Sequence, residues 1–125
     1  MEITRQNKLD RIKSRALELI KNVTIINIKA KKMKLIAYYD WKNDSVIINE
    51  NMLDTLSEGC LTYIVVHELI HKITKTRNHD ARFLTKLISI YDLSNIIKYE
   101  TEITAFSISN RVIQGSGDSG LLCKL

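Results

Sequence analysis

Apolar residues recur at three- and four-residue spacing in four stretches of this 125-residue chain. This spacing predicts helices that each pack one face on a core, because an α-helix completes a turn in about 3.6 residues. The stretches are residues 2–21, a segment from about 58 to 74, residues 80–91 and residues 94–113. In the last helix, the residues expected to face inward are Ile97, Thr104, Ala105, Ile108 and Val112.

Residues 23–49 follow a different pattern, in which branched residues predominate or apolar and polar side chains alternate. Alternation with a period of two is typical of a strand that buries one face. We expect three short strands, over residues 23–29, 33–42 and 45–49, joined by tight turns into an antiparallel sheet. A small sheet inserted between helices predicts an α+β fold.

The second helix carries the motif His-Glu-x-x-His at residues 67–71. Residues four apart lie about 40° apart around a helix axis, so His67 and His71 can point ring nitrogens at one metal ion. Glu68 projects from the edge of the same face and can reach a water on that metal without being a ligand itself. The opposite face is apolar, with Leu61, Val65, Leu69 and Ile73 at four-residue spacing.

The start of this helix and the histidine content favour the metal interpretation. Thr55 and Glu58 have the spacing of a capping box, which predicts a helix start at residues 55–58. The plainer alternative is a pair of hydrogen-bonded core histidines that fall at helical spacing by chance. However, the chain has only three histidines, and all of them lie between positions 67 and 79.

Length and composition indicate one domain over residues 1–114 and a flexible tail, residues 115–125, of Gly/Ser linker composition. The chain has no run of eighteen apolar residues, and its N-terminus lacks the apolar core of a signal peptide. We therefore expect a cytoplasmic protein that makes no membrane contact. Two cysteines, Cys60 and Cys123, are too few for a disulfide framework, and Cys60 is expected to be a buried structural thiol.

The formal net charge of +5 predicts attraction to acidic partners such as DNA. The basic residues at the first turn of the sheet are either a solvated turn or a phosphate-binding patch. They are Lys29, Lys31, Lys32 and Lys34. The alternative to an enzyme is therefore a basic nucleic-acid-binding protein with a structural or vestigial metal site.

A catalytic zinc site has three protein ligands and one position for water, so His67 and His71 require a partner. His79 follows His71 after a seven-residue spacer that can bring the chain back toward the metal. Glu102 lies in the last helix, within Glu-x-x-Ala, and could also reach the site. Both candidates stay open on the spacing alone.

Two sets of motifs resemble known metallopeptidases. The helical His-Glu-Leu-Ile-His, followed by His79-Asp-Ala-Arg-Phe83 and preceded by the strand Ser-Val-Ile-Ile-Asn, resembles the SprT-like, WLM and YgjP-like zincins. That resemblance implies a zincin-like fold, Zn²⁺ bound by His67, His71 and His79, and hydrolysis of peptide bonds. The order of elements with the late Glu102-x-x-Ala also resembles minigluzincins and ImmA/IrrE-type peptidases, in which that glutamate binds zinc.

Spacing and resemblance together predict a zinc-dependent endopeptidase acting on protein or peptide substrates. Glu68 would be the general base for a zinc-activated water, and we expect Tyr91 or Tyr99 to help stabilise the oxyanion. A sheet edge would hold the extended substrate. A further hypothesis is that the tail folds back and Cys123 replaces the zinc water, since thiolate is a strong zinc ligand.

Overall fold

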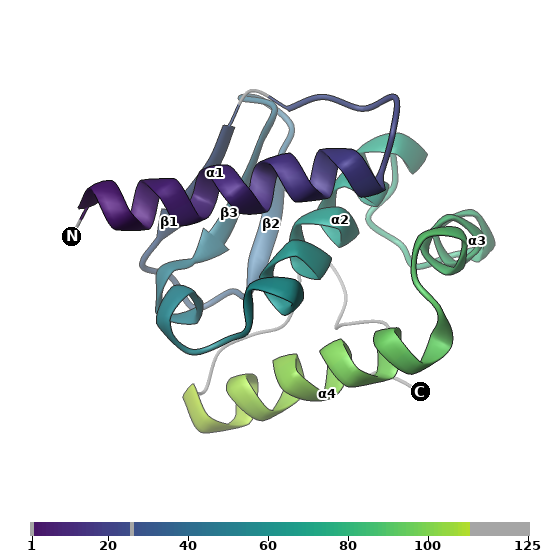
Figure 1. Ribbon diagram of the computed structural model, residues 1–125. Helices are drawn as coiled ribbons and strands as arrows, with labels where there is room; N and C mark the ends of the chain where they lie inside the picture. Colours follow the sequence, from purple (N-terminus) through teal and green to yellow (C-terminus); the bar gives the residue numbers. More distant parts are fainter. Residues whose placement is uncertain (1, 26, 111–125) are drawn as a thin grey trace.

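The computed structural model describes residues 2–25 and 27–110 (Figure 1). The elements are α1 (Glu2–Leu19), β1 (Asn27–Lys31), β2 (Ala37–Asp40), β3 (Ser45–Asn49), the short 3₁₀ helix η1 (Glu50–Asp54), α2 (Glu58–Thr74), α3 (Ala81–Ile90) and α4 (Leu93–Asn110). The predicted α+β class and the order of its elements are confirmed. Val112, Cys123 and the tail expected over residues 115–125 lie outside the described residues.

The sheet is mixed, so the prediction of a purely antiparallel sheet is wrong. The strand order is β1-β3-β2, with β1 parallel and β2 antiparallel to β3. Residues 32–36 cross the end of β3, where the Asn49 side chain donates to the carbonyls of Met33 (2.8 Å) and Leu35 (3.0 Å). Because these carbonyls bond to a side chain, β2 begins only at Ala37. A segment that passes over a strand cannot form the tight hairpin turn that we expected.

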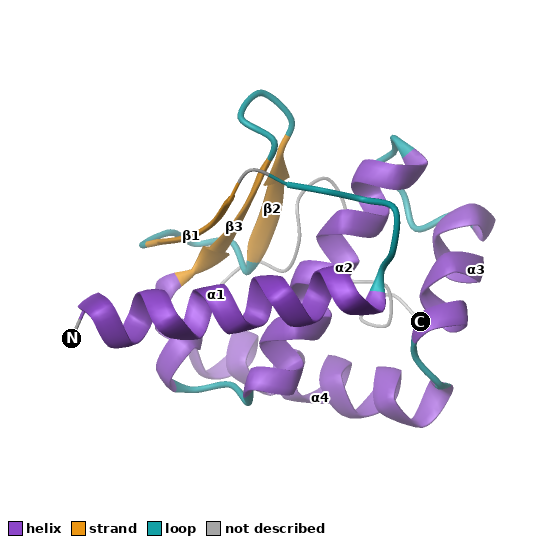
Figure 2. Ribbon diagram, turned by 45° about the horizontal axis from the view of Figure 1, so that its top comes forward, coloured by secondary structure: helices purple, strands orange, loops and turns teal. Residues whose placement is uncertain are grey.

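Helix α2 lies at the centre of the molecule. It contacts three helices, α1, α3 and α4, as well as β2, β3 and η1. Figure 1 shows α1 passing in front of it and α4 below it, and Figure 2 shows β2 as the strand nearest to it. Leu61, Val65 and Leu69 are fully buried, as predicted, whereas Ile73 at the end of the row is exposed. No helix in the described part of the chain is long and apolar enough to cross a membrane.

The predicted inward face of α4 is wrong. Ile97 and Ile108 are 51% and 75% exposed. The residues that α4 buries are Ile96, Glu100, Ile103, Phe106 and Ser107. Two of these are polar and have hydrogen-bond partners: Glu100 accepts from the Tyr63 hydroxyl at 2.6 Å, and Ser107 donates to the Ile103 carbonyl at 3.0 Å. A pattern of apolar positions cannot predict a face that includes a buried carboxylate.

Candidate metal centre

The N-terminal end of α2 is fixed by polar contacts that include Glu102. Ser57 caps the helix, and its hydroxyl accepts from the Cys60 amide at 3.2 Å. The Glu102 carboxylate accepts from the Ser57 amide at 2.7 Å and from the Ser57 hydroxyl at 3.1 Å. The helix begins where predicted, but the capping residue is Ser57, while Thr55 ends η1. Glu102 therefore contacts α2 at Ser57, which is ten residues before His67 and about 15 Å from it along the helix axis.

The three histidines meet near the other end of α2. One ligand atom from each of His67, His71 and His79 can be chosen such that all three lie within 4.8 Å of one another. The chain turns back because Lys75 adopts a left-handed conformation (φ 55°), which ends α2. Asp80 then caps α3 and accepts from the Phe83 amide at 3.1 Å. Of the two candidate third ligands, the structure places His79 with the other histidines.

Phe83 forms the floor of this cluster. Its fully buried ring lies 4.8 Å from His67, 4.6 Å from His71 and 4.7 Å from His79, measured between ring centroids. From the sequence, Phe83 was predicted only as an apolar residue of the third helix and as part of the motif that resembles the zincins. Its contact with all three imidazoles could not be predicted from helical periodicity. A rigid aromatic surface restricts the orientations available to the three rings.

The hydrogen bonds of the cluster prepare the imidazoles to be ligands. The Nδ1 atom of His71 lies 2.8 Å from the Thr76 carbonyl, so it carries the proton and leaves Nε2 unprotonated. Burial, together with His71 and His79, lowers the pKa of His67 and favours the neutral ring that a metal requires. The Nε2 atoms of His67 and His79 lie 3.1 Å apart. Two nitrogen ligands of tetrahedral zinc lie about 3.4 Å apart, so this donor set fits zinc.

Glu68 is buried between α2 and the sheet. Glu68 is only 4% exposed, and the backbone amide of Tyr39 in β2 faces its carboxylate and favours its charged form. Burial raises the pKa of Glu68 to about 8, and the Tyr39 amide offsets part of that increase. A carboxylate with this proton affinity can accept a proton near neutral pH. Glu68, the predicted base, thus follows His67 directly in the chain and lies next to the edge strand β2 in the fold.

The tyrosines expected near the oxyanion surround Tyr63 instead. The rings of Tyr91 and Tyr99 lie 5.1 and 5.4 Å from the Tyr63 ring, whose own centroid is 6.4 Å from that of His67. Cys60 lies in the same region, fully buried, with its Sγ atom 3.7 Å from the Tyr99 carbonyl. Burial raises the pKa of this thiol, in agreement with the predicted structural role.

A small mixed sheet, a helix bearing His-Glu-x-x-His and a histidine from the following loop define a zincin-like metallopeptidase fold. The chain is 32% identical over 102 residues to the uncharacterized protein MJ0123 of Methanocaldococcus jannaschii, covering 78% of this chain and 92% of that protein. It therefore belongs to the family of MJ0123. No family model matches, so the SprT-like, WLM and YgjP-like groups stay a resemblance.

Two solved structures are similar in fold to most of this chain. One is the metallopeptidase zymogen of Methanocaldococcus jannaschii jannalysin, with a TM-score of 0.67 and 30% identity over 78% of this chain and 94% of that chain. The other is the metallopeptidase zymogen of Pyrococcus abyssi abylysin, with a TM-score of 0.60 over 81% of this chain and 92% of that chain. At 22% identity, the second comparison supports the fold alone.

Proposed function

We propose that this chain is a zinc-dependent metalloendopeptidase that hydrolyses peptide bonds in protein or peptide substrates. His67, His71 and His79 would hold the metal, and Glu68 would be the general base. The observation that carries the proposal is the convergence of three imidazoles within 4.8 Å, beside a buried glutamate on the same helix. Similarity to the jannalysin zymogen, a metallopeptidase, supports it.

Each residue of the proposed site has its own role in the reaction. Zinc, when bound, supplies a Lewis acid that acidifies water and polarises a carbonyl. Glu68 takes the proton of the attacking water and delivers it to the departing amine, for which its raised proton affinity is suited. His71 is held in orientation by the Thr76 carbonyl, and Phe83 packs against all three rings. Preorganised ligands avoid rearrangement during the reaction.

The edge of the sheet supplies a site for an extended substrate. Among the described strands, β2 pairs only with β3, so its outer edge is free of strand partners. The Tyr39 amide on β2 points at Glu68. An extended peptide added along this edge would therefore pass the general base, with main-chain hydrogen bonds providing affinity for many sequences.

The decisive experiment combines metal analysis with a peptidase assay. We expect about one zinc per chain, and hydrolysis of a quenched fluorescent peptide or of casein that a chelator removes and added zinc restores. Because jannalysin was solved as a zymogen, we infer that this chain is also made in a latent form. The assay is therefore run on the intact chain and on chain nicked by a serine protease that is afterwards blocked with a serine-specific inhibitor.

Two results would contradict the proposal. The first is a zinc-loaded chain that cleaves no peptide either intact or nicked. The second is hydrolysis that persists unchanged in chelator. Salt-dependent DNA binding that survives chelation, without any hydrolysis, would support the nucleic-acid-binding alternative.

A further inference from the structure

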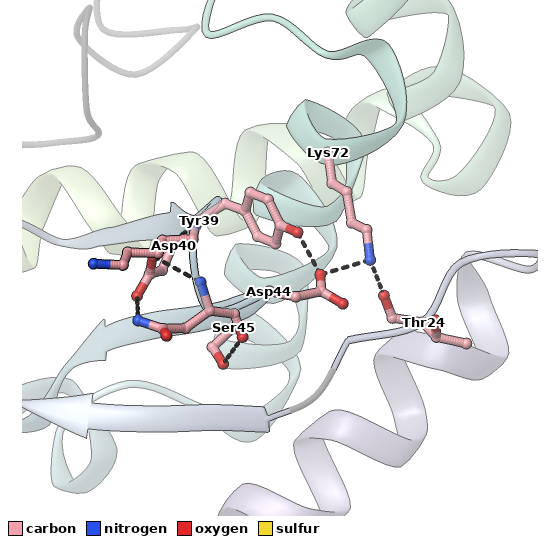
Figure 3. Close-up of polar contacts among 8 residues, drawn as sticks. Thr24, Tyr39, Asp40, Asp44, Ser45 and Lys72 are labelled. Carbon is pink, nitrogen blue, oxygen red and sulfur yellow. Dashed lines mark hydrogen bonds and ion pairs between the residues drawn. The ribbon is translucent and has the colours of Figure 1, made fainter.

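Three segments that are distant in sequence meet at Lys72, one residue after His71. The Lys72 ammonium group donates to the Asp44 carboxylate at 2.7 Å and to the backbone carbonyl of Thr24. The same Asp44 oxygen accepts from the Tyr39 hydroxyl. Figure 3 shows these contacts joining α2, the β2–β3 turn and the segment that leads into β1. One lysine thus ties the end of the active-site helix to both sides of the sheet.

This network is better enclosed than the other ion pairs of α2. The side chains of Lys72 and Asp44 are 24% and 33% exposed, whereas those of Arg11 and Glu58 are 59% and 42% exposed. The Lys72 ammonium also lies 5.8 Å from the centre of the buried Tyr39 ring, a cation–π distance. Screening by water weakens exposed pairs more than enclosed ones.

The backbone at Asp44 shows that the turn is held in a specific conformation. Asp44 has φ 48°, in the left-handed region that few non-glycine residues adopt. Its carboxylate bonds to Lys72 and Tyr39, which compensates for an unfavourable backbone geometry. The network therefore determines where the β2–β3 turn, and with it Tyr39, lies relative to α2.

Tyr39 connects this network to Glu68. Its hydroxyl bonds to Asp44, while its backbone amide faces the Glu68 carboxylate and favours the charged form of that group. Lys72 and Glu68 are four residues apart on α2, so they project from the same side of the helix. Tyr39 thus connects β2 to α2 in two ways. Its side chain reaches Lys72 through Asp44, and its main chain faces Glu68.

We propose that Lys72, Asp44 and Tyr39 form a positioning network that holds the Tyr39 amide on the Glu68 carboxylate and so orients the general base. The proposal rests on the proposed peptidase function. A glutamate side chain has three rotatable bonds, and a fixed donor at its end selects one orientation from several. These three residues act through Glu68 and do not touch the reacting atoms themselves.

The first test is kinetic. Tyr39→Phe removes one hydrogen bond of the network, Lys72→Met removes every contact of the ammonium group, and Lys72→Arg retains the charge. We expect kcat to fall about 10- to 100-fold in the first two variants, with KM within about threefold and zinc content unchanged. Lys72→Arg should recover most of the loss. Glu58→Gln, the matched control, breaks the exposed ion pair with Arg11 on the same helix and should leave kcat unchanged.

The two losses should also be non-additive. If Lys72 and Tyr39 act as one unit, the double variant loses little more kcat than either single variant. Equal kcat in wild type, Lys72→Met and Tyr39→Phe would overturn the proposal, as would a purely KM effect. Should Lys72→Met fail to fold, Tyr39→Phe still decides, because it deletes only a hydroxyl.

The second test requires no activity. In metal-free protein, NMR hydrogen exchange measures how well the Tyr39 amide is protected. We expect exchange at Tyr39 to become at least about tenfold faster in Lys72→Met and Tyr39→Phe, while the core amide of Leu69 is unaffected. Unchanged protection at Tyr39, or equal acceleration at Leu69, would overturn the inference. A zinc-loaded wild-type chain that cleaves nothing, either intact or nicked, would refute the peptidase function but leave this measurement decisive for the network.

Discussion

The two ends of α2 hold acidic side chains in opposite ways. At the N-terminal end, Glu58 pairs with Arg11 at 3.0 Å, and Glu102 accepts two hydrogen bonds from Ser57. The hydrogen bond from Arg11 lowers the pKa of Glu58. Farther along, Glu68 is buried, and that burial raises its pKa to about 8. The same helix thus stabilises the carboxylate charge at one end and disfavours it near the other.

This difference separates a structural carboxylate from the proposed general base. A carboxylate whose charge is stabilised by a cation or by a helix N-terminus binds a proton weakly. A general base needs an affinity near the working pH, which burial supplies at Glu68. Sequence position alone does not distinguish the two, because Glu68 and Glu102 both lie within motifs of metallopeptidases. The partners of each carboxylate decide its role.

The largest expected effect comes from neutralising Glu68. Glu68→Gln retains the size of the side chain and one oxygen acceptor, but it cannot take a proton. We expect hydrolysis to fall about 10²- to 10⁴-fold, with the zinc content unchanged, because the residue is a base and not a ligand. Steady-state kinetics and metal analysis on one preparation check both parts. Retained activity would refute its role, and lost zinc would make Glu68 a ligand.

The next test compares His79 with Glu102. Loss of a partner that merely supports a ligand weakens metal binding about 10- to 100-fold, so loss of the ligand itself in His79→Ala should cost at least about 100-fold. Glu102→Ala should leave zinc affinity unchanged and instead lower the free energy of unfolding by about 1 kcal/mol, since it removes contacts at a helix N-terminus. Competition with a fluorescent chelator and urea unfolding measure the two quantities. The reverse result would make Glu102 the third ligand.

Much of the site follows from local sequence rules. Short stretches of sequence encode the helical period of α2, the His-Glu-x-x-His motif and the cap before α3. The spacing alone therefore predicted that His67 and His71 lie on one face of a helix. The choice between His79 and Glu102 depended on tertiary packing. The left-handed turn at Lys75 brings His79 to the other two histidines, and Ser57 engages Glu102; periodicity describes neither.

The errors have a common cause in buried polar groups. The inward face of α4 was mispredicted because Glu100 is buried with Tyr63 as its partner, while Ile97 is exposed. The sheet was mispredicted because the Asn49 side chain bonds to the carbonyls of residues 33 and 35, which allows the chain to cross β3. Partners that are distant in sequence cannot be read from hydrophobic patterning.

The smallest expected effect is the pH dependence of stability, in which the two ends of α2 should differ in sign. Because the pKa of Glu58 is lowered from 4.5, its contribution is present above that pH and is lost as the pH falls through the folded value. The pKa of Glu68 in metal-free protein is raised from 4.5 to about 8, so stability is fully present below 4.5 and is lost as the pH rises toward 8.

Urea unfolding of chelated wild type, Glu58→Gln and Glu68→Gln between pH 3 and 9 measures this contrast. Relative to wild type, Glu58→Gln should be slightly less stable above about pH 4.5, by less than about 1 kcal/mol because the pair is exposed, and the difference should vanish in acid. Glu68→Gln should gain on wild type as the pH rises from 4.5 to 8 and then level off. Titrations common to the three proteins largely cancel in these differences. If Glu68→Gln showed the same slope as Glu58→Gln, the Glu68 carboxylate would be charge-stabilised like its neighbour at the start of the helix, and the physical basis for its role as a base would be lost.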